Sequence, residues 1–481
     1  MVSEDQYTST IGELIESGVI VAHKDGNHGS NYPRSNEFGD EGVPFLTAKL
    51  VSDSGRIDFD NAPRLNLEKA NKIKFGYVEE GDVLLSHNAT VGRVALVPEL
   101  REKVLIGTSL THYRLDSLRL LPKYLAAYFR GRDFQNQLSS MMGGMSTRNQ
   151  VPITAQRLLT VVIPPLEEQK AIAHILGSLD DKIELNRQMN ETLETMAQAL
   201  FKSWFVDFDP VIDNAITAGN AIPDEFAERA EQRKAIEKKD HSDIQDLFPD
   251  EFEFTEEMGW IPKGWEVKCF GDLLDSTIGG DWGKPDQDEK HTRESVIIRG
   301  TDIPKLKIGE RSEAPKRWVE EKKLKTRILR PFDIVIEISG GSPTQSTGRS
   351  IIITEQILER LGGVAEPASF CRKFSPSNKF LGLYAGIHLQ KIYDDGKMWE
   401  YQNQSTGIAN FQTTSFLERE QLVVPSESVV LKFYDTLEPI ISKMSSNQQI
   451  ELARLRDTLL PKLMSGELRI SDAVALVDEA V

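Results

Sequence analysis

Hydrophobic residues recur at alternating steps of four and three over residues 172–204, which is the heptad spacing of a helix that packs along a seam. Residues 166–204 contain no proline, so the pattern predicts one helix roughly 58 Å long at 1.5 Å per residue. Two adjacent seam positions are asparagines, which we expect to fix the register of a helix pair. The seam positions are Ile172, Leu176, Leu179, Ile183, Asn186, Asn190, Leu193, Ala197, Leu200 and Trp204.

A second long helical pattern occupies residues 428–468. Pro439 removes a helical hydrogen bond, so we expect a kink or a break there. Pro461 and Gly466 should mark the end of this helix, which leaves residues 469–481 as a C-terminal tail.

Each helical pattern follows a region of short β-rich runs, such as "DVLLS" and "FDIVIEI", separated by Gly, Asn and Ser. Such runs predict strands joined by turns. "LPKYLAAYF", residues 121–129, is apolar at helical spacing and predicts a helix on the sheet. The predicted fold class is α+β, with two mixed α/β globules of ordinary domain size at residues 1–165 and 259–427.

The order of these patterns is repeated, which indicates a tandem duplication. "TIGELIESG" matches "CFGDLLDST", and "TRNQVPITAQRLLTVVIPP" matches "GIANFQTTSFLEREQLVVPS". Between them, "GDVLLSHNATVGRVALV" matches "FDIVIEISGGSPTQSTGRSIIIT", where the second copy is longer. The aligned pairs are Gly12 with Gly271, Asp82 with Asp333, Arg93 with Arg349, and Asn149 with Asn410.

The first long helix, which we extend to residues 166–211, ends in a cluster of aromatic rings within "LFKSWFVDFDP". Most of these rings lie off the heptad seam, so one coiled-coil partner cannot bury them all. We expect them to dock against the base of a globule or to bind a partner subunit. The rings are those of Phe201, Trp204, Phe205 and Phe208.

Negative charge is concentrated in the middle of the chain. The 481 residues include 57 Lys+Arg and 74 Asp+Glu, a formal net charge of −17. Residues 166–270 hold 11 basic and 24 acidic residues, a net of −13, whereas the flanking regions are close to neutral. Residues 212–258 predict an acidic linker with a transient helix near residues 223–239. The overall charge does not exclude a nucleic-acid partner, because each globule can present a basic face.

The composition favours a soluble protein of the cytoplasm. Hydrophobic residues make up 39% and charged residues 27%, which is typical of a globular chain. No apolar run reaches the length of a transmembrane span, and the amino terminus lacks the pattern of a signal peptide. Cys269 and Cys371 are expected to be unpaired thiols in a reducing compartment.

The sequence lacks the motifs of an enzyme. "GGSPTQSTGRS", residues 340–350, has neither the glycine spacing nor the Lys–Ser/Thr ending of a phosphate-binding loop. The eight histidines are not at metal-ligand spacing, and no glycine-rich cofactor turn of a methyltransferase occurs. Asp333 and Glu337 indicate a metal-dependent nuclease only weakly, because no lysine follows Glu337 at the usual distance. We therefore expect no catalytic residue, no metal site and no cofactor in this chain.

Three segments resemble the specificity subunit of Type I restriction–modification systems. They are "VVIPPLEEQKAIAHILGSLDDKIELNRQMNETLETMAQALFKSWFVDFDPV" (161–211), "LFPDEFEFTEEMGWIPKGWEV" (247–267) and "LRDTLLPKLMSGELRI" (455–470). The resemblance implies two target recognition domains, each reading one half of a bipartite double-stranded DNA target. It implies that the two long helices pair antiparallel as a coiled coil that sets the spacing of the half-sites. In one departure, "SESV" (426–429) lacks the Leu-Glu-Glu-Gln of residues 166–169, which puts equal partner contacts at the two helix starts in doubt.

The resemblance also implies partners that carry out the chemistry. Two modification subunits would use S-adenosylmethionine to methylate adenine, and ATP-dependent restriction subunits would join that core. This chain would itself be a non-catalytic recognition subunit.

Polar loops at strand ends are the places where the resemblance implies DNA reading. The basic run at residues 316–330 would either line phosphates or form an exposed helix face that is balanced by Glu320 and Glu321. The candidate DNA-binding residues are Thr47, Lys49, His87, Asn88, Arg93, Arg148, Asn149, Arg299, Thr301, Gln345, Arg349 and Asn410.

Two alternative functions stay open on the sequence alone. A coiled-coil scaffold whose globules bind protein fits the acidic middle segment, and a metal-dependent nuclease would rely on Asp333 and Glu337. Salt dependence separates DNA binding from the scaffold, because phosphate contacts weaken steeply with ionic strength.

Overall fold

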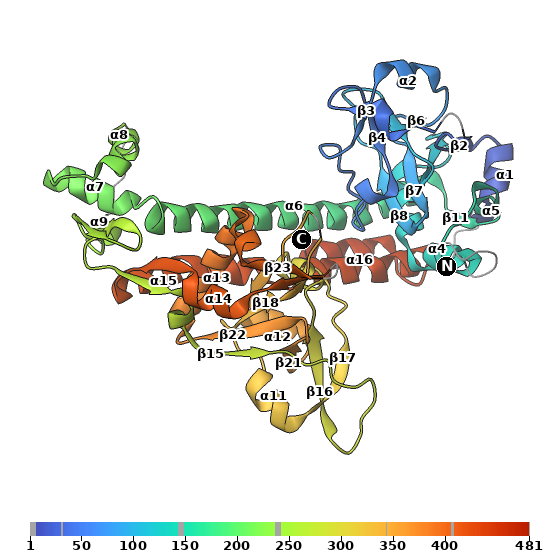
Figure 1. The fold of residues 1–481 in the computed structure, drawn as a ribbon. Coiled ribbons are helices and arrows are strands. Elements are labelled where there is room, and N and C mark those ends of the chain that lie inside the picture. The colour runs from blue at the N-terminus through green and yellow to red at the C-terminus, as the bar shows by residue number, and fades with distance from the viewer. Residues whose placement is uncertain are drawn as a thin grey trace. The chain divides into compact units, whose positions relative to one another are not determined.

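The computed structural model describes residues 6–29, 32–142, 149–235, 242–342, 344–405 and 408–480. The chain divides into two compact units: unit 1 comprises residues 1–184 and 451–481, and unit 2 comprises residues 185–450. Figure 1 shows α6 (Leu166–Phe205) as one unbroken helix. Its 40 residues confirm the helix predicted over residues 166–204 and correspond to about 60 Å. The predicted extension to residue 211 is wrong, because Phe208 has a φ of 53° and separates α6 from a new helix that begins at Asp209. The first half of α6 belongs to unit 1 and the second half to unit 2.

Two sheets form the centre of unit 1. A four-stranded antiparallel sheet has the order β2–β10–β7–β8, and a second sheet has the order β3–β5–β4–β9–β6. Within the second sheet, β4 and β9 run parallel. The strand bounds are β2 (Ile20–Asp25), β10 (Leu110–Leu115), β7 (Val83–Asn88), β8 (Thr90–Leu96), β3 (Phe38–Gly39), β5 (Arg64–Leu65), β4 (Val43–Leu46), β9 (Val104–Ile106) and β6 (Tyr77–Val78). A separate pair joins β1 (Tyr7–Thr10) to β11 (Thr160–Ile163).

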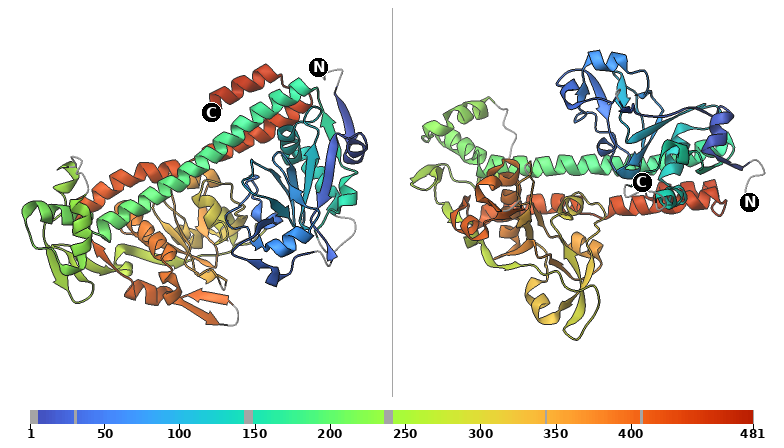
Figure 2. Two further views of the ribbon diagram at one scale, coloured as in Figure 1. Left: turned by 90° about the horizontal axis from the view of Figure 1, so that it is seen from above. Right: turned by 45° about the vertical axis from the view of Figure 1, so that its right-hand side comes forward.

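Helices cover the four-stranded sheet of unit 1. α3 (Pro122–Arg130) confirms the helix predicted at residues 121–129, and it buries Tyr124 and Phe129 in the main core. In both views of Figure 2, α16 lies alongside the first half of α6. The other helices are α1 (Ile11–Glu16), α2 (Leu67–Lys72), α4 (Arg132–Met142), α5 (Ile153–Gln156), α16 (Gln448–Met464) and α17 (Ile470–Ala480). In the ranges given above, none of the helices has the length and apolar character needed to cross a membrane.

Unit 2 repeats this plan. Its four-stranded antiparallel sheet has the order β15–β22–β18–β20, and a second sheet has the order β17–β16–β21, in which β16 and β21 run parallel. The strand bounds are β15 (Leu274–Gly279), β22 (Cys371–Pro376), β18 (Ile334–Glu337), β20 (Ser350–Ile352), β17 (Lys316–Glu320), β16 (His291–Ile298), β21 (Ala365–Pro367), β14 (Glu266–Cys269), β25 (Gln421–Val424), β19 (Ser339–Gly340), β24 (Ile408–Phe411), β23 (Gln402–Ser405), β12 (Phe252–Thr255) and β13 (Gly259–Pro262). The helix bounds are α7 (Asp209–Ala218), α8 (Ala227–Lys234), α9 (Ser242–Gln245), α10 (Ile303–Lys307), α11 (Glu321–Arg327), α12 (Glu355–Leu361), α13 (Lys379–Asp394), α14 (Thr413–Arg419) and α15 (Glu427–Met444).

Buried aspartates that pair with a cation of the neighbouring strand occupy equivalent places in the two units. Asp82 precedes β7, and the Arg114 guanidinium on β10 donates to its carboxylate in two bonds of 2.8 Å. Asp333 precedes β18 in the same way, and its carboxylate lies 3.2 Å from the Lys373 Nζ on β22. The shared strand order and these pairs confirm the predicted duplication and the alignment of Asp82 with Asp333.

Glycine allows a close approach of the backbone at another aligned pair. A Cβ on Gly12 would lie 3.2 Å from the carbonyl oxygen of Arg157, and a Cβ on Gly271 would lie 2.8 Å from that of Leu417. The helix that begins here therefore passes close to the backbone in both units, which confirms the alignment of the two glycines.

The aligned asparagines need a correction of one residue. Asn88 pairs with Gln150, and Ser339 pairs with Asn410. Asn88 and Ser339 follow the buried aspartates of their units at the same sequence distance. The counterpart of Asn410 is therefore Gln150, and the predicted match with Asn149 is wrong.

The second long helix is broken, but not at its proline. α15 runs through Pro439 and ends at Met444, and α16 begins at Gln448. The break falls on two serines and an asparagine at residues 445–447, whose short polar side chains compete with the helix for backbone hydrogen bonds. Of the kink or break predicted at Pro439, the break is therefore wrong. The predicted end is confirmed at Gly466, which has a φ of 69°. The tail beyond it forms α17.

Residues 212–235 are folded rather than a solvated linker. The Arg229 guanidinium on α8 binds the Asp209 carboxylate on α7 through two bonds of 2.7 Å, and Arg233 binds Asp213 one turn further on. Burial alone would raise the pKa of Asp209, but the bond from Arg229 holds it below its usual value. The predicted linker is corrected because two aspartates four residues apart face two arginines at the same spacing.

The aromatic ending of α6 is buried within unit 2. The ring centroid of Phe205 lies 4.8 Å from that of Phe433 on α15 and 5.0 Å from that of Tyr384 on α13. The four rings of the cluster, which are only 1–5% exposed, are Phe201, Trp204, Phe205 and Phe208. They dock against the base of the second globule, and their expected role as a partner-binding surface is corrected because their neighbours are side chains of this chain.

Candidate nucleic-acid interface

In unit 1 the carboxyl ends of β4, β7 and β9 meet at one edge. The amide of Gly107 donates to the carbonyl of Leu46 at 2.7 Å, and the amide of Ala48 donates to the Ser109 Oγ at 2.8 Å. The amide of His87 donates to the Ser109 carbonyl at 3.0 Å. Ser109 therefore ties the three strand ends together. We define edge 1 as residues 47–49, 87–93, 107–109 and 149–150.

Edge 1 presents several polar side chains of the predicted set. Lys49 and Asn149 are exposed, and Thr47 and Asn88 are half-buried. Ala89 has a φ of 63°, and its amide donates to the carbonyl of Asn149 at 3.0 Å. This turn places Asn88 close to Asn149, so two amide side chains with donor and acceptor atoms share one end of the sheet.

His87 and Arg93 brace edge 1 instead of projecting from it. His87 is 1% exposed, and its Nδ1 lies 2.8 Å from the Thr111 Oγ1. Burial lowers the pKa of His87, so its ring is neutral near pH 7. Arg93 donates to the Asp53 carboxylate at 2.7 Å and to two backbone carbonyls. Arg148, the remaining candidate of the first copy, lies outside the described residues.

A buried polar network supports edge 1 from within the sheet. The Gln156 Oε1 accepts a hydrogen bond of 2.6 Å from the Tyr113 hydroxyl and lies 3.3 Å from the His23 Nε2. The Gln156 Nε2 donates to the Thr111 Oγ1 at 3.1 Å, and Thr111 in turn contacts His87. Burial lowers the pKa of His23 to about 4, which keeps this ring neutral as well. The network connects β2, β7, β10 and α5.

Unit 2 builds an equivalent edge at the ends of β16, β18 and β21. The amide of Ala368 donates to the Ile298 carbonyl at 2.8 Å, and the amide of Ile338 donates to the Phe370 carbonyl at 2.9 Å. A Cβ on Gly300 would collide with the Glu337 carboxylate, so glycine permits the close approach of two strand ends. We define edge 2 as residues 299–301, 338–342, 344–349, 368–370 and 409–411.

Edge 2 contains all the predicted residues of the second copy. Thr301 and Asn410 are exposed, and the Asn410 Oδ1 accepts a hydrogen bond of 3.0 Å from the Ser339 Oγ. Gln345 is half-buried, and its Nε2 lies 3.3 Å from the hydroxyl of Tyr393. Polar groups of three different loops therefore converge on this edge.

Both arginines of edge 2 are paired with carboxylates. Arg349 binds Glu337 in a bidentate arrangement, with Nε–Oε2 and Nη2–Oε1 distances of 2.8 and 2.7 Å. Arg299 binds Asp302 at 2.8 and 2.9 Å. A bidentate pair uses the planar face of donors that would otherwise recognise a ligand. In this arrangement the two arginines fix the strand ends.

The two carboxylates of the nuclease alternative are each engaged by a cation of the chain. Glu337 is held by Arg349, and the Asp333 carboxylate lies near Lys373 and accepts from the amide of Arg330 at 2.8 Å. Across the described ranges, His, Cys, Asp and Glu side chains form no group of three or more that is placed to hold a metal ion. The geometry gives this alternative no support.

Exposed aromatic rings near edge 2 were missed by the sequence reasoning. Phe370 is 67% exposed and takes the place that Ser109 has in edge 1, because the carbonyl of each accepts from the end of the neighbouring strand. Trp282, 39% exposed, has the Arg317 guanidinium 4.9 Å from its ring centroid. The available signal was the phenylalanine in the turn of "EPASFCRKF", between a strand that ends at Pro367 and one that begins at Cys371.

The basic run at residues 316–330 lies on β17 and α11. The Lys323 Nζ is 2.9 Å from a Glu320 carboxylate oxygen, which neutralises part of the run. Lys322 and Lys325 are exposed on α11. The run therefore offers some cationic groups to a ligand, but fewer than its composition indicates.

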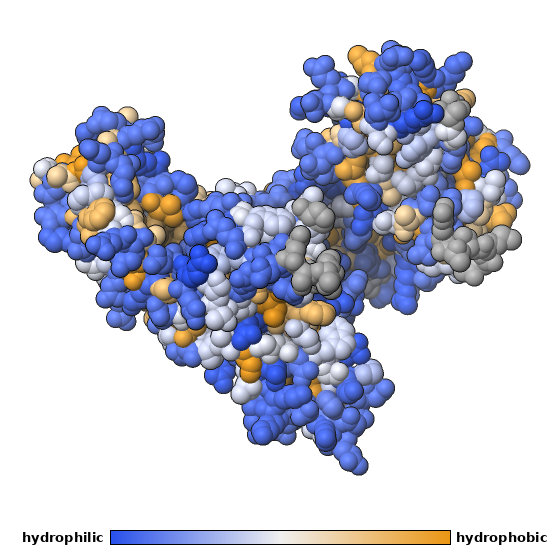
Figure 3. Space-filling view, viewed as in Figure 1, coloured by the Kyte–Doolittle hydropathy of each residue, from blue (hydrophilic) through white to orange (hydrophobic). Residues whose placement is uncertain are grey.

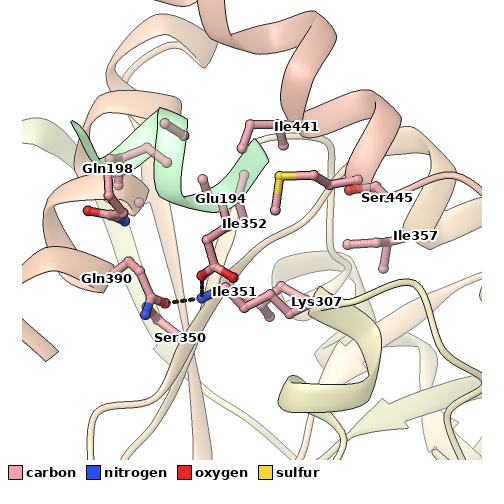
Figure 4. Close-up of a pocket in the computed structure, with 14 residues that line it drawn as sticks. Glu194, Gln198, Lys307, Ser350, Ile351, Ile352, Ile357, Gln390, Ile441 and Ser445 are labelled. Atoms are coloured by element: carbon pink, nitrogen blue, oxygen red, sulfur yellow. Dashed lines mark hydrogen bonds and ion pairs between the residues drawn. The ribbon is translucent and has the colours of Figure 1, made fainter. Parts of the chain in front are cut away.

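A small, partly open cavity lies in unit 2 between α6, α13 and α15. Figure 4 shows Lys307 bonded to both Glu194 and Gln390 at this cavity. Its apolar lining includes Ile351, Ile352, Ile357 and Ile441. Because the ammonium of Lys307 binds side chains of α6 and α13, these contacts link the long helix to the second globule.

The chain is similar in sequence to specificity subunits of Type I restriction enzymes. Residues 8–195 match the family described as Type I restriction modification DNA specificity domain. The chain is 26% identical over 419 residues to the Type I restriction enzyme HindI specificity subunit of Haemophilus influenzae, covering 81% of this chain and 87% of that protein. It is 24% identical over 450 residues to the Type I restriction enzyme MjaIX specificity subunit of Methanocaldococcus jannaschii, covering 91% and 89%. The crystal structure of the Type-I restriction-modification system S subunit from M. genitalium aligns with 96% of each chain at 14% identity and a TM-score of 0.47.

Proposed function

Because the chain belongs to the family of Type I restriction–modification DNA specificity subunits, we propose that edge 1 and edge 2 each read one half of a bipartite DNA target. The observation that carries this proposal is that the same strand-end edge is built twice. In each unit, backbone bonds tie the ends of three strands and leave polar side chains exposed beside them. Two such edges suit a target with two separate half-sites.

The exposed residues divide into two roles. Lys49 on edge 1 binds a phosphate and sets the register of unit 1 on the duplex. Asn149 and Asn410 have amide groups that match the donor and acceptor pair of adenine in the major groove. Phe370 adds an apolar contact to a thymine methyl group in the second half-site. Arg93 and Arg349 position the loops.

The long helices set the distance between the half-sites. α6 is continuous through both units, and in unit 2 it runs antiparallel to α15, because Asn190 bonds the Met444 carbonyl while Phe205 contacts Phe433 further along. A helix of fixed length is a stiff spacer. Insertions in α6 would therefore alter the spacing without altering the bases that are read.

The chemistry belongs to partner subunits. Two modification subunits bind S-adenosylmethionine and methylate adenine in each half-site, and ATP-dependent restriction subunits join this core. An adenine must leave the helical stack to be methylated, so placement of the modification subunit must be rigid. This chain is a non-catalytic recognition subunit of the cytoplasm, without a cofactor of its own.

DNA binding with the purified modification subunit tests the proposal. The complex should bind a bipartite duplex specifically, with an affinity that falls steeply as salt rises, because phosphate contacts release counterions. Salt-insensitive binding, or none at any DNA, would favour the scaffold alternative. Methylation or cleavage by the isolated chain would contradict the non-catalytic role.

A further inference from the structure

A pair of aromatic rings is exposed on the hairpin formed by β12 and β13 in unit 2. Phe254 is 63% exposed and Trp260 is 36% exposed, and they face each other across the strands with ring centroids 5.6 Å apart. Met258, at the turn between the strands, is 42% exposed. The rings that end α6 are buried, so this hairpin is where aromatic surface of the same region reaches solvent.

The exposed rings are held in a fixed position. Phe252, two residues before Phe254 and therefore on the same strand face, packs against Phe226 with a centroid distance of 5.0 Å. The amide of Lys263 donates to the Glu251 carbonyl at 2.9 Å, which closes the open end of the hairpin. The patch is thus an extension of the aromatic core at the end of α6, and little conformational entropy would be lost when it binds.

Two acidic side chains lie at the turn beside the patch and indicate the charge of its partner. Glu256 and Glu257 directly precede Met258 on the turn, and both are exposed. Glu253 lies on the opposite face of β12, where its carboxylate accepts a hydrogen bond of 2.6 Å from the amide of Gly264. In Figure 3, hydrophobic surface lies among hydrophilic surface over the end of unit 2 that holds α7, α8 and α9. Carboxylates next to the rings would repel DNA phosphates, so the complementary ligand is a cationic protein surface.

We propose that the β12–β13 hairpin docks into an apolar depression on the modification subunit that is bordered by Lys and Arg side chains. The inference rests on the proposed function only in taking the modification subunit as the partner. Phe254 and Trp260 fill the depression, and Glu256 and Glu257 pair with the basic border. Aromatic anchors that become buried at the centre of an interface supply most of its affinity, while charges at the rim act on association rate and salt dependence.

Two variants of the full chain separate these contributions. Phe254→Ser with Trp260→Ser removes the anchors and should weaken binding of purified modification subunit about 30-fold, the effect of losing a central hot spot. Glu256→Lys with Glu257→Lys keeps the rings and should slow association several-fold, with a flatter dependence on salt. Phe75→Ser in unit 1 is the matched control, because Phe75 is 58% exposed and lies far along the chain from the hairpin; it should bind as the wild type does.

Titration by mass photometry, which counts modification subunits per chain, provides the readout. The inference is overturned if the wild-type chain binds the modification subunit and both hairpin variants match it in affinity and salt dependence. It is also overturned if the aromatic variant changes only self-association of this chain. Failure of the wild-type chain to bind any modification subunit would instead contradict the proposed function. If the aromatic variant misfolds, the charge variant still tests the inference through its association rate and salt dependence, because its substitutions are on an exposed turn.

Discussion

Arg114 donates two hydrogen bonds of 2.8 Å to the carboxylate of Asp82 at the start of β7. Asp82 is only 1% exposed, so this carboxylate depends on Arg114 for compensation of its buried charge. Six residues later the same strand ends in edge 1. The ion pair therefore fixes the beginning of a strand whose other end carries candidate DNA contacts, and Lys373 does the same beside Asp333 in unit 2.

Replacing Asp82 by Asn should destabilise unit 1 by roughly 3 kcal/mol, because Arg114 would lose the buried one of its two anionic partners. Hydrogen–deuterium exchange of the β7 and β10 amides measures the effect. Glu79→Gln is a matched control, since Glu79 also binds Arg114, at 2.6 Å, but its side chain is 68% exposed. The control should cost less than about 1 kcal/mol. Equal losses in the two variants would contradict a structural role for the buried pair.

A buried acid in unit 2 should make stability depend on pH. Glu366 on β21 is 0% exposed, and neither of its carboxylate oxygens has a hydrogen-bond partner among the described residues. Burial raises its pKa from 4.5 to about 7. Because the folded-state pKa is raised, the stability that the protonated form contributes is complete below pH 4.5 and is lost as the pH rises through 7.

Glu366→Gln should therefore stabilise unit 2 at pH 8 by up to about 3 kcal/mol and have little effect at pH 4.5. Thermal unfolding at the two pH values, followed by a probe in unit 2, measures the difference. A gain of the same size at both pH values would show that charge on Glu366 is not the cause.

A buried histidine in unit 1 should act in the opposite direction. Burial lowers the pKa of His23 from 6.5 to about 4, so the neutral ring contributes stability that is complete above pH 6.5 and is lost as the pH falls towards 4. The loss should reach about 3 kcal/mol. His23→Gln, which cannot titrate, should flatten the pH dependence of amide exchange in β2 and β10 over that range. A profile unchanged by the substitution would assign the dependence to another group.

Lys49 and Phe370 should affect DNA binding in different ways. Lys49→Ala should weaken binding to all sequences alike and reduce the salt slope by about 1, as expected for one phosphate contact. Binding isotherms of the complex over a range of salt concentrations measure both effects. A loss confined to one target sequence would instead assign Lys49 to base recognition.

Phe370→Ala should relax the preference for one base pair of the second half-site, by roughly tenfold, while leaving the salt slope unchanged. Replacing single thymines of the target by uracil removes the methyl group and should abolish the difference between wild type and variant at one position only. Trp399→Ala is a control with comparable chemistry, because Trp399 is also exposed, at 41%, and lies outside edge 2. No position-specific effect of uracil would contradict the proposed methyl contact.

Local patterns in the sequence predicted the helices and strands. The contacts and burial of individual side chains depend instead on residues that are distant in the sequence. The heptad seam predicted α6, and the aligned aspartates predicted equivalent strand starts, because periodicity and repetition are local properties. The sequence could not reveal that Arg349 is tied to Glu337 or that His87 points inward, since both depend on which strands become neighbours. The prediction of a linker after α6 was wrong for the same reason. The segment is folded because Arg229 and Arg233 on α8 form ion pairs with aspartates on α7.

The most direct test of the central claim is single-molecule sequencing of methylated adenines in cells that carry the chain and its partner subunits. The wild type should give a bipartite motif with one methylated adenine in each half. Asn149→Ala on edge 1 should relax only one half of that motif, and Asn410→Ala on edge 2 should relax only the other. A continuous motif, or variants that each alter both halves, would contradict the claim that the two edges read separate half-sites.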